Sequence, residues 1–317
     1  MTPMSPWQPT SPTETLRHRA ELLALLRRFF DQRGVMEVTT PVLTAGITDV
    51  HIDSLCLADA PPNLSQRWLR TSPEYAHKRL LAAGHSDLYE LGPVFRAGER
   101  GRWHRPEFTL LEWYRVGWTW RQLANEVISL IEHCAALSSR RWTPCWMTYS
   151  QAFEQALSID PVHISDGELR LLTPDLPDHF DHTARLDWLW SSAVQAKLPA
   201  DQLTVIHHYP ASQAALAQLD PEQPHCALRF EVFLGSIELA NGYQELTDAQ
   251  AQGQRFADDN RAREAQGRPS MAVDEAFMAA LQHGLPACSG VALGVERLLM
   301  ALLDIDDISQ VMAFADG

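Results

Sequence analysis

The sequence lacks the features of a secreted or membrane protein. Its five cysteines are Cys56, Cys134, Cys145, Cys226 and Cys288. They are scattered and form no CxxC pair, so reduced thiols are expected rather than disulfides. No apolar run approaches the roughly 18 residues of a membrane-spanning helix, and residues 1–13, MTPMSPWQPTSPT, contain no apolar signal core. We therefore expect a cytoplasmic protein with no membrane partner.

Positive charge is also scarce. Lys and Arg together number 26 against 40 Asp and Glu, which leaves a formal net charge of −14. Because nucleic acids are bound through clustered basic side chains, this balance argues against a broad nucleic-acid surface. A local basic pocket is still compatible with it. The hydrophobic content of 45% and the charged content of 21% are typical of a globular protein.

The 317 residues could form one large domain or two ordinary ones. The Pro and Thr content of residues 1–13 predicts a short flexible tail. No internal repeat and no linker divides residues 14–317. We therefore expect a single domain over residues 14–317.

Helix-starting signals recur along the chain. Ser11-Pro12-Thr13-Glu14 is typical of a capping box with Pro at the first helical position. Ser72-Pro73-Glu74 predicts a second helix by the same pattern, and Thr119 with Gln122 predicts a third. Residues 138–200 predict helical connections that cover one side of a sheet.

The central stretch of the chain is FRAGERGRWHRPEFTLLEWY, residues 95–114. Apolar runs before and after its polar, Gly-containing segment predict two strands joined by a long hairpin loop. Such a loop can close over an anion with its arginines and stack an aromatic ring on a purine. The alternative is a solvated charged hairpin, and composition alone does not decide between them.

A second hairpin is predicted at residues 228–243. Apolar residues alternate along LRFEVFL, and Gly235-Ser236 offers a two-residue turn. This turn would pair residue 234 with 237 and residue 231 with 240. Glu231 and Glu238 would then lie on one sheet face, within reach of a shared cation.

Near the C-terminus, SGVALGVERL predicts a strand with two glycines that runs directly into a helix. A helix, strand and Pro near 34–41, the loop at 95–114 and GVALGVERL occur in the order of the three motifs of class II aminoacyl-tRNA synthetases. SPEYAHKRLLAAG, HRPEFTLLEWY and IELANGYQELTD make the chain resemble class II lysyl-tRNA synthetases in particular. The resemblance covers roughly residues 14–315.

The resemblance implies an α+β fold, with an antiparallel sheet of about six strands flanked by helices. It also implies a homodimer with residues 14–41 at the interface. Lysyl-tRNA synthetases carry an N-terminal anticodon-binding OB-fold, for which this chain has no room before residue 14. A truncated chain of this kind resembles the ligases that attach (R)-β-lysine to a lysine of translation elongation factor P.

By the same resemblance, ATP and Mg²⁺ are the expected cofactors. Arg96 would clamp the α-phosphate and the substrate carboxylate, because its planar fork suits two anions. Arg297 would meet the γ-phosphate, and Phe108 would stack on adenine. Glu231 and Glu238 would hold Mg²⁺. The further ATP-binding positions are Gly98, Glu99, Arg105, Glu238, Leu239 and Gly294.

Four positions match those that surround the amino acid in the lysyl family: Glu74, Glu112, Tyr114 and Glu245. Glu74 would bind the amino group, and Glu245 with Tyr114 would meet the terminal ammonium. Carboxylates around a narrow pocket select a cation. Ser72 and Ala292 stand where lysyl synthetases commonly have Ala and Gly. These changes could accommodate an amino group moved from the α to the β carbon.

The chain departs from the family pattern at two positions of the loop. Relatives commonly read FRNE, whereas this chain has Phe95-Arg96-Ala97-Gly98-Glu99. Glu99 would replace the family's Glu through a one-residue shift, or Gly98 would offer only backbone contacts. Relatives also favour HNPEF, where this chain has Arg105 in place of Asn. If Arg105 contributes mainly its backbone, adenine binding survives. If the Asn side chain is required, ATP affinity should be weak.

The expected reaction has two steps, adenylation of β-lysine by ATP and transfer of the acyl group to an elongation factor P lysine. One alternative is an enzyme that loads α-lysine onto tRNA, which the acidic charge and the missing OB-fold disfavour. A second is a non-catalytic regulator that binds lysine or ATP. No tRNA partner is expected.

Overall fold

The structure is a computed structural model that describes residues 7–46, 52–58, 67–138, 140–265, 267 and 270–315. Residues 1–6 of the expected flexible tail lie outside the described residues. The Thr10 N–H donates to the Ala313 carbonyl (2.9 Å), and Ser11 Oγ donates to the Met312 carbonyl (2.6 Å). The first described residues therefore lie against the C-terminal segment.

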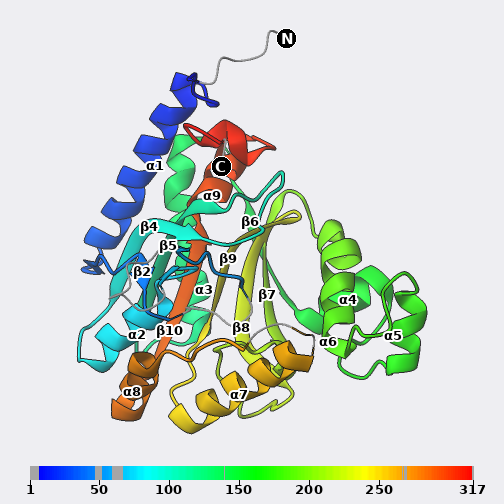
Figure 1. Ribbon diagram of the computed structural model, residues 1–317. Helices are drawn as coiled ribbons and strands as arrows, with labels where there is room; N and C mark the ends of the chain where they lie inside the picture. The colour runs from blue at the N-terminus through cyan, green and yellow to red at the C-terminus, as the bar shows by residue number, and fades with distance from the viewer. Residues whose placement is uncertain are drawn as a thin grey trace.

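The main sheet has eight strands in the described part of the chain. It lies at the centre of the molecule (Figure 1). In spatial order its strands are β1 (Met36–Glu37), β4 (Leu88–Phe95), β5 (Glu107–Val116), β10 (Cys288–Gly294), β9 (Ile237–Gln244), β8 (Cys226–Leu234), β7 (Gln202–Pro210) and β6 (Thr143–Thr148). A separate two-stranded sheet pairs β2 (Leu43–Thr44) with β3 (Trp68–Leu69).

The expectation of an antiparallel sheet of about six strands is wrong at both edges. In spatial order, β4, β5, β10, β9, β8 and β7 pair antiparallel with one another. At the two edges, β1 is parallel to β4 and β6 is parallel to β7. Parallel neighbours need a long crossover connection. Helices supply it here: α4 to α6 lie between β6 and β7, and α2 lies between β1 and β4. The strand predicted near residues 34–41 is present as β1, but its parallel pairing was not predicted, and β6 lies in the irregular 138–200 segment.

The described helices are α1 (Thr13–Asp31), α2 (Glu74–Ala82), α3 (Trp120–Cys134), α4 (Tyr149–Leu157), α5 (Asp166–Leu172), α6 (His182–Leu189), α7 (Ala249–Ala265), α8 (Glu275–Gly284) and α9 (Val295–Leu303). None of these helices is long and apolar enough to cross a membrane. The capping box of Thr119 and Gln122 is confirmed at α3. The one predicted at Ser11 is wrong, since the N-cap of α1 is Pro12 and the Ser11 hydroxyl bonds to the C-terminal segment instead. At α2 the N-cap is Pro73, again without a side-chain cap.

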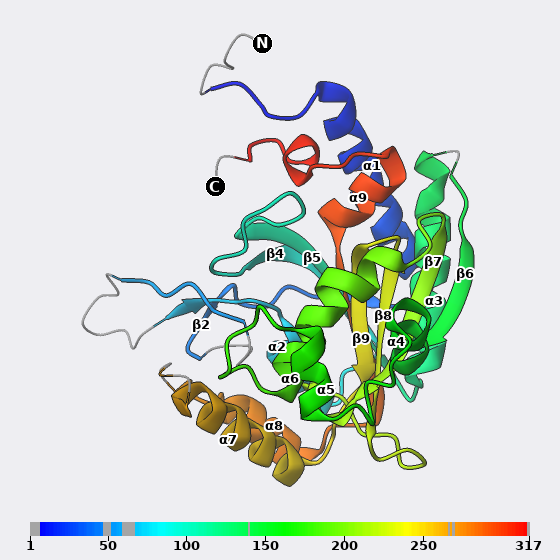
Figure 2. The same ribbon diagram turned by 90° about the vertical axis from the view of Figure 1, so that its right-hand side faces the viewer.

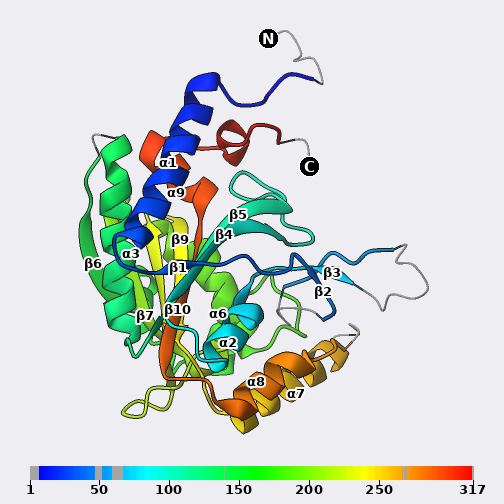
Figure 3. The ribbon, with the colours of Figure 1, turned by 90° about the vertical axis from the view of Figure 1, so that its left-hand side faces the viewer.

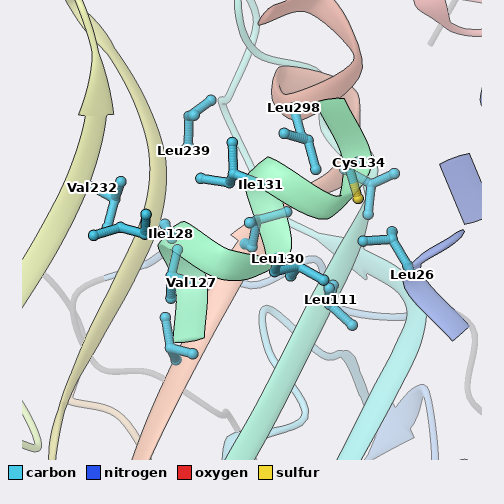
Figure 4. Close-up of a cluster of buried hydrophobic side chains, with 14 of the residues drawn as sticks. Leu26, Leu111, Val127, Ile128, Leu130, Ile131, Cys134, Val232, Leu239 and Leu298 are labelled. Atoms are coloured by element: carbon cyan, nitrogen blue, oxygen red, sulfur yellow. The ribbon is translucent and has the colours of Figure 1, made fainter. Parts of the chain in front are cut away.

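Helices α1, α3 and α9 cover one face of the sheet (Figure 3). Leu111 and Trp113 of β5 are fully buried on that side. Figure 4 shows Ile128 of α3 near Val232 of β8 and Ile131 of α3 near Leu239 of β9, within the same cluster. Burial of these apolar side chains supplies most of the driving force for folding.

On the opposite face, the described helices pack toward its two ends (Figure 2). Helices α2, α7 and α8 pack at one end, where the Tyr75 and Phe277 rings stack with centroids 4.3 Å apart. At the other end, α4 to α6 pack with Phe233 of β8 in a second apolar cluster. The prediction of helical connections over residues 138–200 is thus confirmed, although the segment also contains β6. The middle of this face is left for the site.

The β8–β9 hairpin has the predicted turn but a different register. Leu234 pairs with Ile237, yet Glu231 pairs with Asn241 rather than with residue 240. The cause is a bulge at the register shift between Val232 and Phe233, which leaves Leu239 unpaired. A bulge changes the alternation of faces, so Glu238 and Asn241 both share the face of Glu231.

Candidate functional site

A cavity of about 270 Å³ opens over the middle of the sheet, on the face opposite α1 and α3. Alternate residues of β5 line it, because successive side chains of a strand point to opposite faces. These are Phe108, Leu110, Glu112 and Tyr114. Strands β9 and β10 and the loop between β4 and β5 complete the walls, so the predicted hairpin loop stands beside the strands of the second predicted hairpin.

The two predicted arginines stand at one end of the cavity. The Arg96 guanidinium carbon lies 5.1 Å from the centre of the Phe108 ring, and Nη1 lies 3.5 Å from Glu99 Oε1. Arg297 Nη1 donates to the Glu238 carbonyl (3.0 Å), and Nη2 donates to His104 Nε2 (2.6 Å). Burial and the charge of Arg297 lower the pKa of His104, so its imidazole is a neutral acceptor. This end can bind anions.

The other end of the cavity is acidic and buried. Glu74, Glu112 and Glu245 are each less than 10% exposed. Lys78 lies behind them, with Nζ 2.6 Å from Glu74 Oε1 and 2.5 Å from Glu245 Oε2. Burial alone would lower the pKa of Lys78, but the two carboxylates outweigh it and raise the pKa. Lys78 is therefore a fixed cation that offsets only part of the negative charge.

The surplus of carboxylates shows in their pKa values. Burial, reinforced by the charge of Glu74, raises the pKa of Glu112 to about 8. Burial also raises the pKa of Glu245 to about 8, although Lys78 opposes the rise. Groups held partly protonated by burial and mutual repulsion give up their protons when a cation arrives. The acidic end is thus prepared for an ammonium group.

Neutral donors hold the carboxylates in place. Ser72 Oγ donates to Glu112 Oε2 (2.8 Å), and Tyr114 donates to Glu112 Oε1 (3.0 Å). The Tyr243 hydroxyl donates to Glu74 Oε1 (2.8 Å). Each bond orients a carboxylate before any ligand enters, which reduces the cost of ordering the site.

Gly290 of β10 makes room for the acidic end. A Cβ at this position would lie 2.3 Å from Glu245 Oε1 and 2.3 Å from Tyr114 Cε1. Any side chain would therefore displace two of the predicted ligand-binding groups. At Gly294 a Cβ would have Arg297 Cδ as its nearest neighbour, at 3.8 Å. The backbone of Gly294 is therefore exposed to the cavity without a close protein contact.

The predicted metal ligands differ in their surroundings. Glu238 lines the cavity, whereas Glu231 is buried and accepts hydrogen bonds from Tyr209 (2.7 Å) and Arg229 (2.5 Å). Burial raises the pKa of Glu231 to about 7; Arg229 opposes the rise and Glu238 adds to it. Asn241 Oδ1 is buried with no hydrogen-bond partner in the described part of the chain. This all-oxygen donor set suits Mg²⁺.

Most of the other predicted site residues also reach the cavity. Those that line it are Ser72, Glu74, Arg96, Glu99, Arg105, Phe108, Glu112, Tyr114, Glu238, Leu239, Glu245, Ala292, Gly294 and Arg297. Gly98 and Glu231 are not among the lining residues that the structure describes. Gly98 has φ +78°, so it serves the turn of the loop. The Arg105 guanidinium donates to the His104 carbonyl (2.8 Å) and thus faces its own loop.

Several residues of the site were missed. Asn241 and Tyr243 line the cavity, and the two-residue spacing of Tyr243 from the predicted Glu245 could have revealed Tyr243. No sequence signal marks the contact between the loop and the C-terminal segment. There Arg102 Nε donates to the Asp306 carbonyl (2.9 Å), and the Ile308 N–H donates to the Arg102 carbonyl (2.9 Å).

Comparisons with known proteins agree with this geometry. The family model of class II tRNA synthetases (D, K and N) matches residues 8–316. A protein of Hamiltonella defensa named elongation factor P–(R)-beta-lysine ligase is 43% identical over 97% of this chain and 97% of its own length. Proteins of the same name from Proteus mirabilis and Edwardsiella ictaluri are 43% and 42% identical, each over 99% of this chain and 98% and 99% of their own lengths. The chain belongs to the class II tRNA synthetase family of the D, K and N type.

Proposed function

We propose that the protein activates (R)-β-lysine with ATP and transfers the β-lysyl group to the ε-amine of a lysine of elongation factor P. The observation that carries the proposal is the polarity of one cavity, with Arg96 and Arg297 at one end and buried Glu74, Glu112 and Glu245 at the other. The relatives that share this name match nearly the whole chain, which supports the same reaction.

The acidic end would bind the amino groups of the substrate. Lysine and β-lysine each carry two ammonium groups, and the carboxylates Glu74, Glu112 and Glu245 offer more negative charge than Lys78 neutralises. The same charges would repel an aspartate side chain. Glu74 would take the amino group near the backbone, while Glu245 and Tyr114 would take the terminal ammonium.

The basic end would bind the reacting groups. The substrate carboxylate attacks the α-phosphorus of ATP, a carboxylate oxygen–phosphorus bond forms, and the bond to pyrophosphate breaks. No protein nucleophile is needed, so positioning and charge neutralisation do most of the work. Arg96 would hold the carboxylate and the α-phosphate together, Arg297 would meet the γ-phosphate, and Phe108 would stack on adenine.

The supporting ATP contacts are proposed at Gly98, Glu99, Arg105, Leu239 and Gly294. Arg105 would act through its backbone, because its guanidinium is already bonded to the His104 carbonyl of its own loop. ATP binding then survives the change from the family's Asn. Glu99 lines the cavity beside Arg96, which favours the one-residue shift of the family's Glu over a backbone role for Gly98.

Mg²⁺ would be held by Glu231 and Glu238. Within the described residues, no group of three or more His, Cys, Asp or Glu is arranged to bind a metal. Two protein carboxylates plus phosphate oxygens are an ordinary coordination for this ion. When bound, Mg²⁺ would offset charge on the phosphates. Glu231 would then be ionised, with Tyr209 and Arg229 keeping its orientation.

In the second step the acceptor ε-amine attacks the activated carbonyl. A carbon–nitrogen bond forms, the bond to the adenylate oxygen breaks, AMP leaves, and the amine loses its proton. Arg96 would remain in place to stabilise the leaving phosphate. The acceptor protein is a translation factor, so the reaction would take place in the cytoplasm, with no tRNA involved.

The choice of isomer is assigned to Ser72 and Ala292. Ser72 Oγ accepts from the backbone N–H of Glu74 (2.9 Å) and donates to the Glu112 carboxylate (2.8 Å), so it links the start of α2 to Glu112 at the amino end of the pocket. Ala292 lies between Glu112 of β5 and Asn241 of β9 in the sheet. Replacing both by the family's common residues, Ser72→Ala with Ala292→Gly, should shift the preference toward α-lysine.

We also propose a homodimer formed through residues 14–41. Met36 is 42% exposed, although it is apolar and lies on an edge strand of the main sheet. Exposed apolar side chains on an edge favour a subunit contact. Sedimentation equilibrium of the wild type and of Met36→Glu tests this, since the variant should shift the equilibrium toward the monomer.

The function is tested with purified protein, ATP, each lysine isomer, and either elongation factor P or tRNA. We expect ATP–pyrophosphate exchange that prefers β-lysine, and label transferred to elongation factor P. Label on tRNA would identify a synthetase, and absence of exchange with either isomer would identify a regulator. Exchange without isomer preference would refute the assignment of Ser72 and Ala292.

A further inference from the structure

His77 is a buried histidine directly behind the acidic end of the cavity. It lies on α2 with 0% exposure and does not line the cavity itself. Its Nε2 is 3.1 Å from Glu90 Oε2. Its ring meets Tyr114 edge-on, with centroids 5.5 Å apart and planes at 86°. The imidazole therefore contacts a group of the substrate pocket from outside that pocket.

Glu90 determines which nitrogen of His77 carries a proton. The Glu90 carboxylate accepts from Thr40 Oγ1 (2.7 Å) and from Arg70 Nη1 (2.7 Å). Burial would raise its pKa, but the hydrogen bonds from His77 and Thr40 and the charge of Arg70 lower it to about 2. An ionised carboxylate accepts only, so His77 Nε2 must be the donor. Burial also lowers the pKa of His77, which leaves the ring neutral and Nδ1 without a hydrogen.

The lone pair of Nδ1 points toward Glu112. Nδ1 is 3.7 Å from Glu112 Oε1, and no donor reaches it within the described chain. A buried acceptor without a donor is costly, and facing an ionised carboxylate it would also be repelled. Of the charged and titratable groups around the ring, Arg70 is bonded to Glu90, and Glu74 Oε1 accepts from Lys78 Nζ (2.6 Å) and from the Tyr243 hydroxyl (2.8 Å). The Tyr114 hydroxyl already donates to Glu112.

A proton on Glu112 would satisfy both groups. The separation of 3.7 Å closes to a hydrogen bond with a shift of less than 1 Å, within the range of a side-chain adjustment. Burial raises the pKa of Glu112 to about 8, so its carboxyl is mostly protonated at pH 7. The geometry thus joins a buried acceptor that has no donor among the described residues to a neighbouring acid that can become its donor.

We propose that His77 is a positioning residue that keeps Glu112 as a neutral acid in the empty pocket, with Nδ1 accepting a hydrogen bond from the Glu112 carboxyl. When a cationic amino acid binds, the O–H bond of Glu112 breaks, its proton leaves to solvent, and the ammonium group takes its place. The proposal rests on the proposed function only for the identity of that cation. It explains how three carboxylates stay together before a ligand arrives.

The first test uses ¹⁵N-histidine NMR on the full-length protein, with His77→Gln to assign the resonances. We expect a neutral ring protonated at Nε2 at pH 7, and an Nδ1 resonance that moves as Glu112 titrates at a pKa of about 8. An imidazolium at pH 7, a proton on Nδ1, or an Nδ1 resonance that ignores this titration would overturn the proposal.

The second test compares two variants by ATP–pyrophosphate exchange as a function of pH. Gln places its amide near the position of Nε2, whereas Asn places its amide near that of Nδ1. His77→Gln should lower the pH midpoint of the amino-acid KM by about 0.5 to 1 unit, because the neutral form of Glu112 loses a hydrogen bond. It should leave kcat within about two-fold. His77→Asn should keep the midpoint near that of the wild type.

A purely structural role predicts a different pattern. Both variants would then melt at lower temperature and keep the wild-type midpoint, and that result would reject the positioning role. If the wild type shows no exchange with either lysine isomer, the proposed function fails instead. The NMR titration still decides the state of His77 in that case, because it requires no turnover.

Discussion

Replacing Lys78 by methionine is expected to destabilise the protein by about 3 kcal/mol at pH 8, because breaking a buried ion pair leaves uncompensated charge. Lys78 is 1% exposed and lies within 2.6 Å of Glu74 and 2.5 Å of Glu245. Methionine has nearly the same shape, so the cost is electrostatic rather than a cavity. We take the lower end of the 3–5 kcal/mol range because the carboxylates can partly escape their repulsion by taking up protons.

The loss should depend on pH. The pKa of Glu245 is already about 8 with Lys78 present, above its ordinary value of 4.5, and removal of the cation raises it further. A carboxyl whose pKa is higher in the folded state binds more protons there than when unfolded. The folded state is therefore weakened as pH rises from about 4.5 through the folded pKa. The difference between variant and wild type should be small at pH 5.5 and largest at pH 8 and above.

Thermal unfolding followed by circular dichroism measures this difference. About 3 kcal/mol corresponds to a fall in Tm of roughly 6 °C for a chain of this size. The matched control is Lys197→Met, the same substitution at the only other lysine of the sequence, which is exposed and contacts the Ala156 carbonyl. The control should melt within about 1 °C of the wild type at every pH.

A fall in Tm below about 1 °C at pH 8 would refute the reasoning, as would a loss that is the same at pH 5.5 and pH 8. Addition of β-lysine gives a second check. Its ammonium group would supply a cation to the same carboxylates, so it should raise the Tm of the variant more than that of the wild type. An equal rise in both proteins would separate the ligand site from the Lys78 site.

Three further changes test the rest of the site. Gly290→Ala should raise the KM of the amino acid about 100-fold, because its Cβ would lie 2.3 Å from Glu245 and Tyr114. Gly294→Ala should raise the KM of ATP instead, and ATP–pyrophosphate exchange kinetics measure both KM values. Gly98→Ala should cost about 1 kcal/mol in thermal unfolding because φ is +78°, while Gly101→Ala, outside the left-handed region, should cost less. Glu238→Gln should raise the Mg²⁺ concentration for half-maximal exchange about ten-fold, and Glu132→Gln on the exposed side of α3 should leave it unchanged. Equal effects of variant and control in any pair would contradict the assignment.

The sequence predicts the parts of this molecule that depend on local patterns. The structure confirms the predicted hairpin of β4 and β5 and the strand β10 that continues into helix α9. It also confirms the capping box at the start of α3. Each follows from the spacing of a few neighbouring residues. Nearly all of the predicted pocket residues came from family motifs, and the structure brings them into one cavity.

The remainder depends on contacts between distant residues. A lysine on a short amphipathic helix, such as Lys78, is normally expected to be exposed to solvent. Its partner Glu245 lies 167 positions later, just after strand β9. The bulge at Leu239 does not change the residues or the pairing of the turn, yet it determines that Asn241 faces the cavity. The parallel edge strands β1 and β6 are set by crossover helices rather than by their own residues.

The buried position of Lys78 also bears on selectivity between amines. An acyl-adenylate reacts with any unprotonated amine within reach, and the amine of Lys78 lies behind Glu74 and Glu245 at the acidic end of the same pocket. Glu74 and Glu245 raise its pKa, so the nitrogen keeps its proton and has no lone pair to offer. Lys78, which offsets part of the negative charge of the pocket, therefore cannot accept the acyl group. The acyl-adenylate persists until the amine of an acceptor protein arrives from outside.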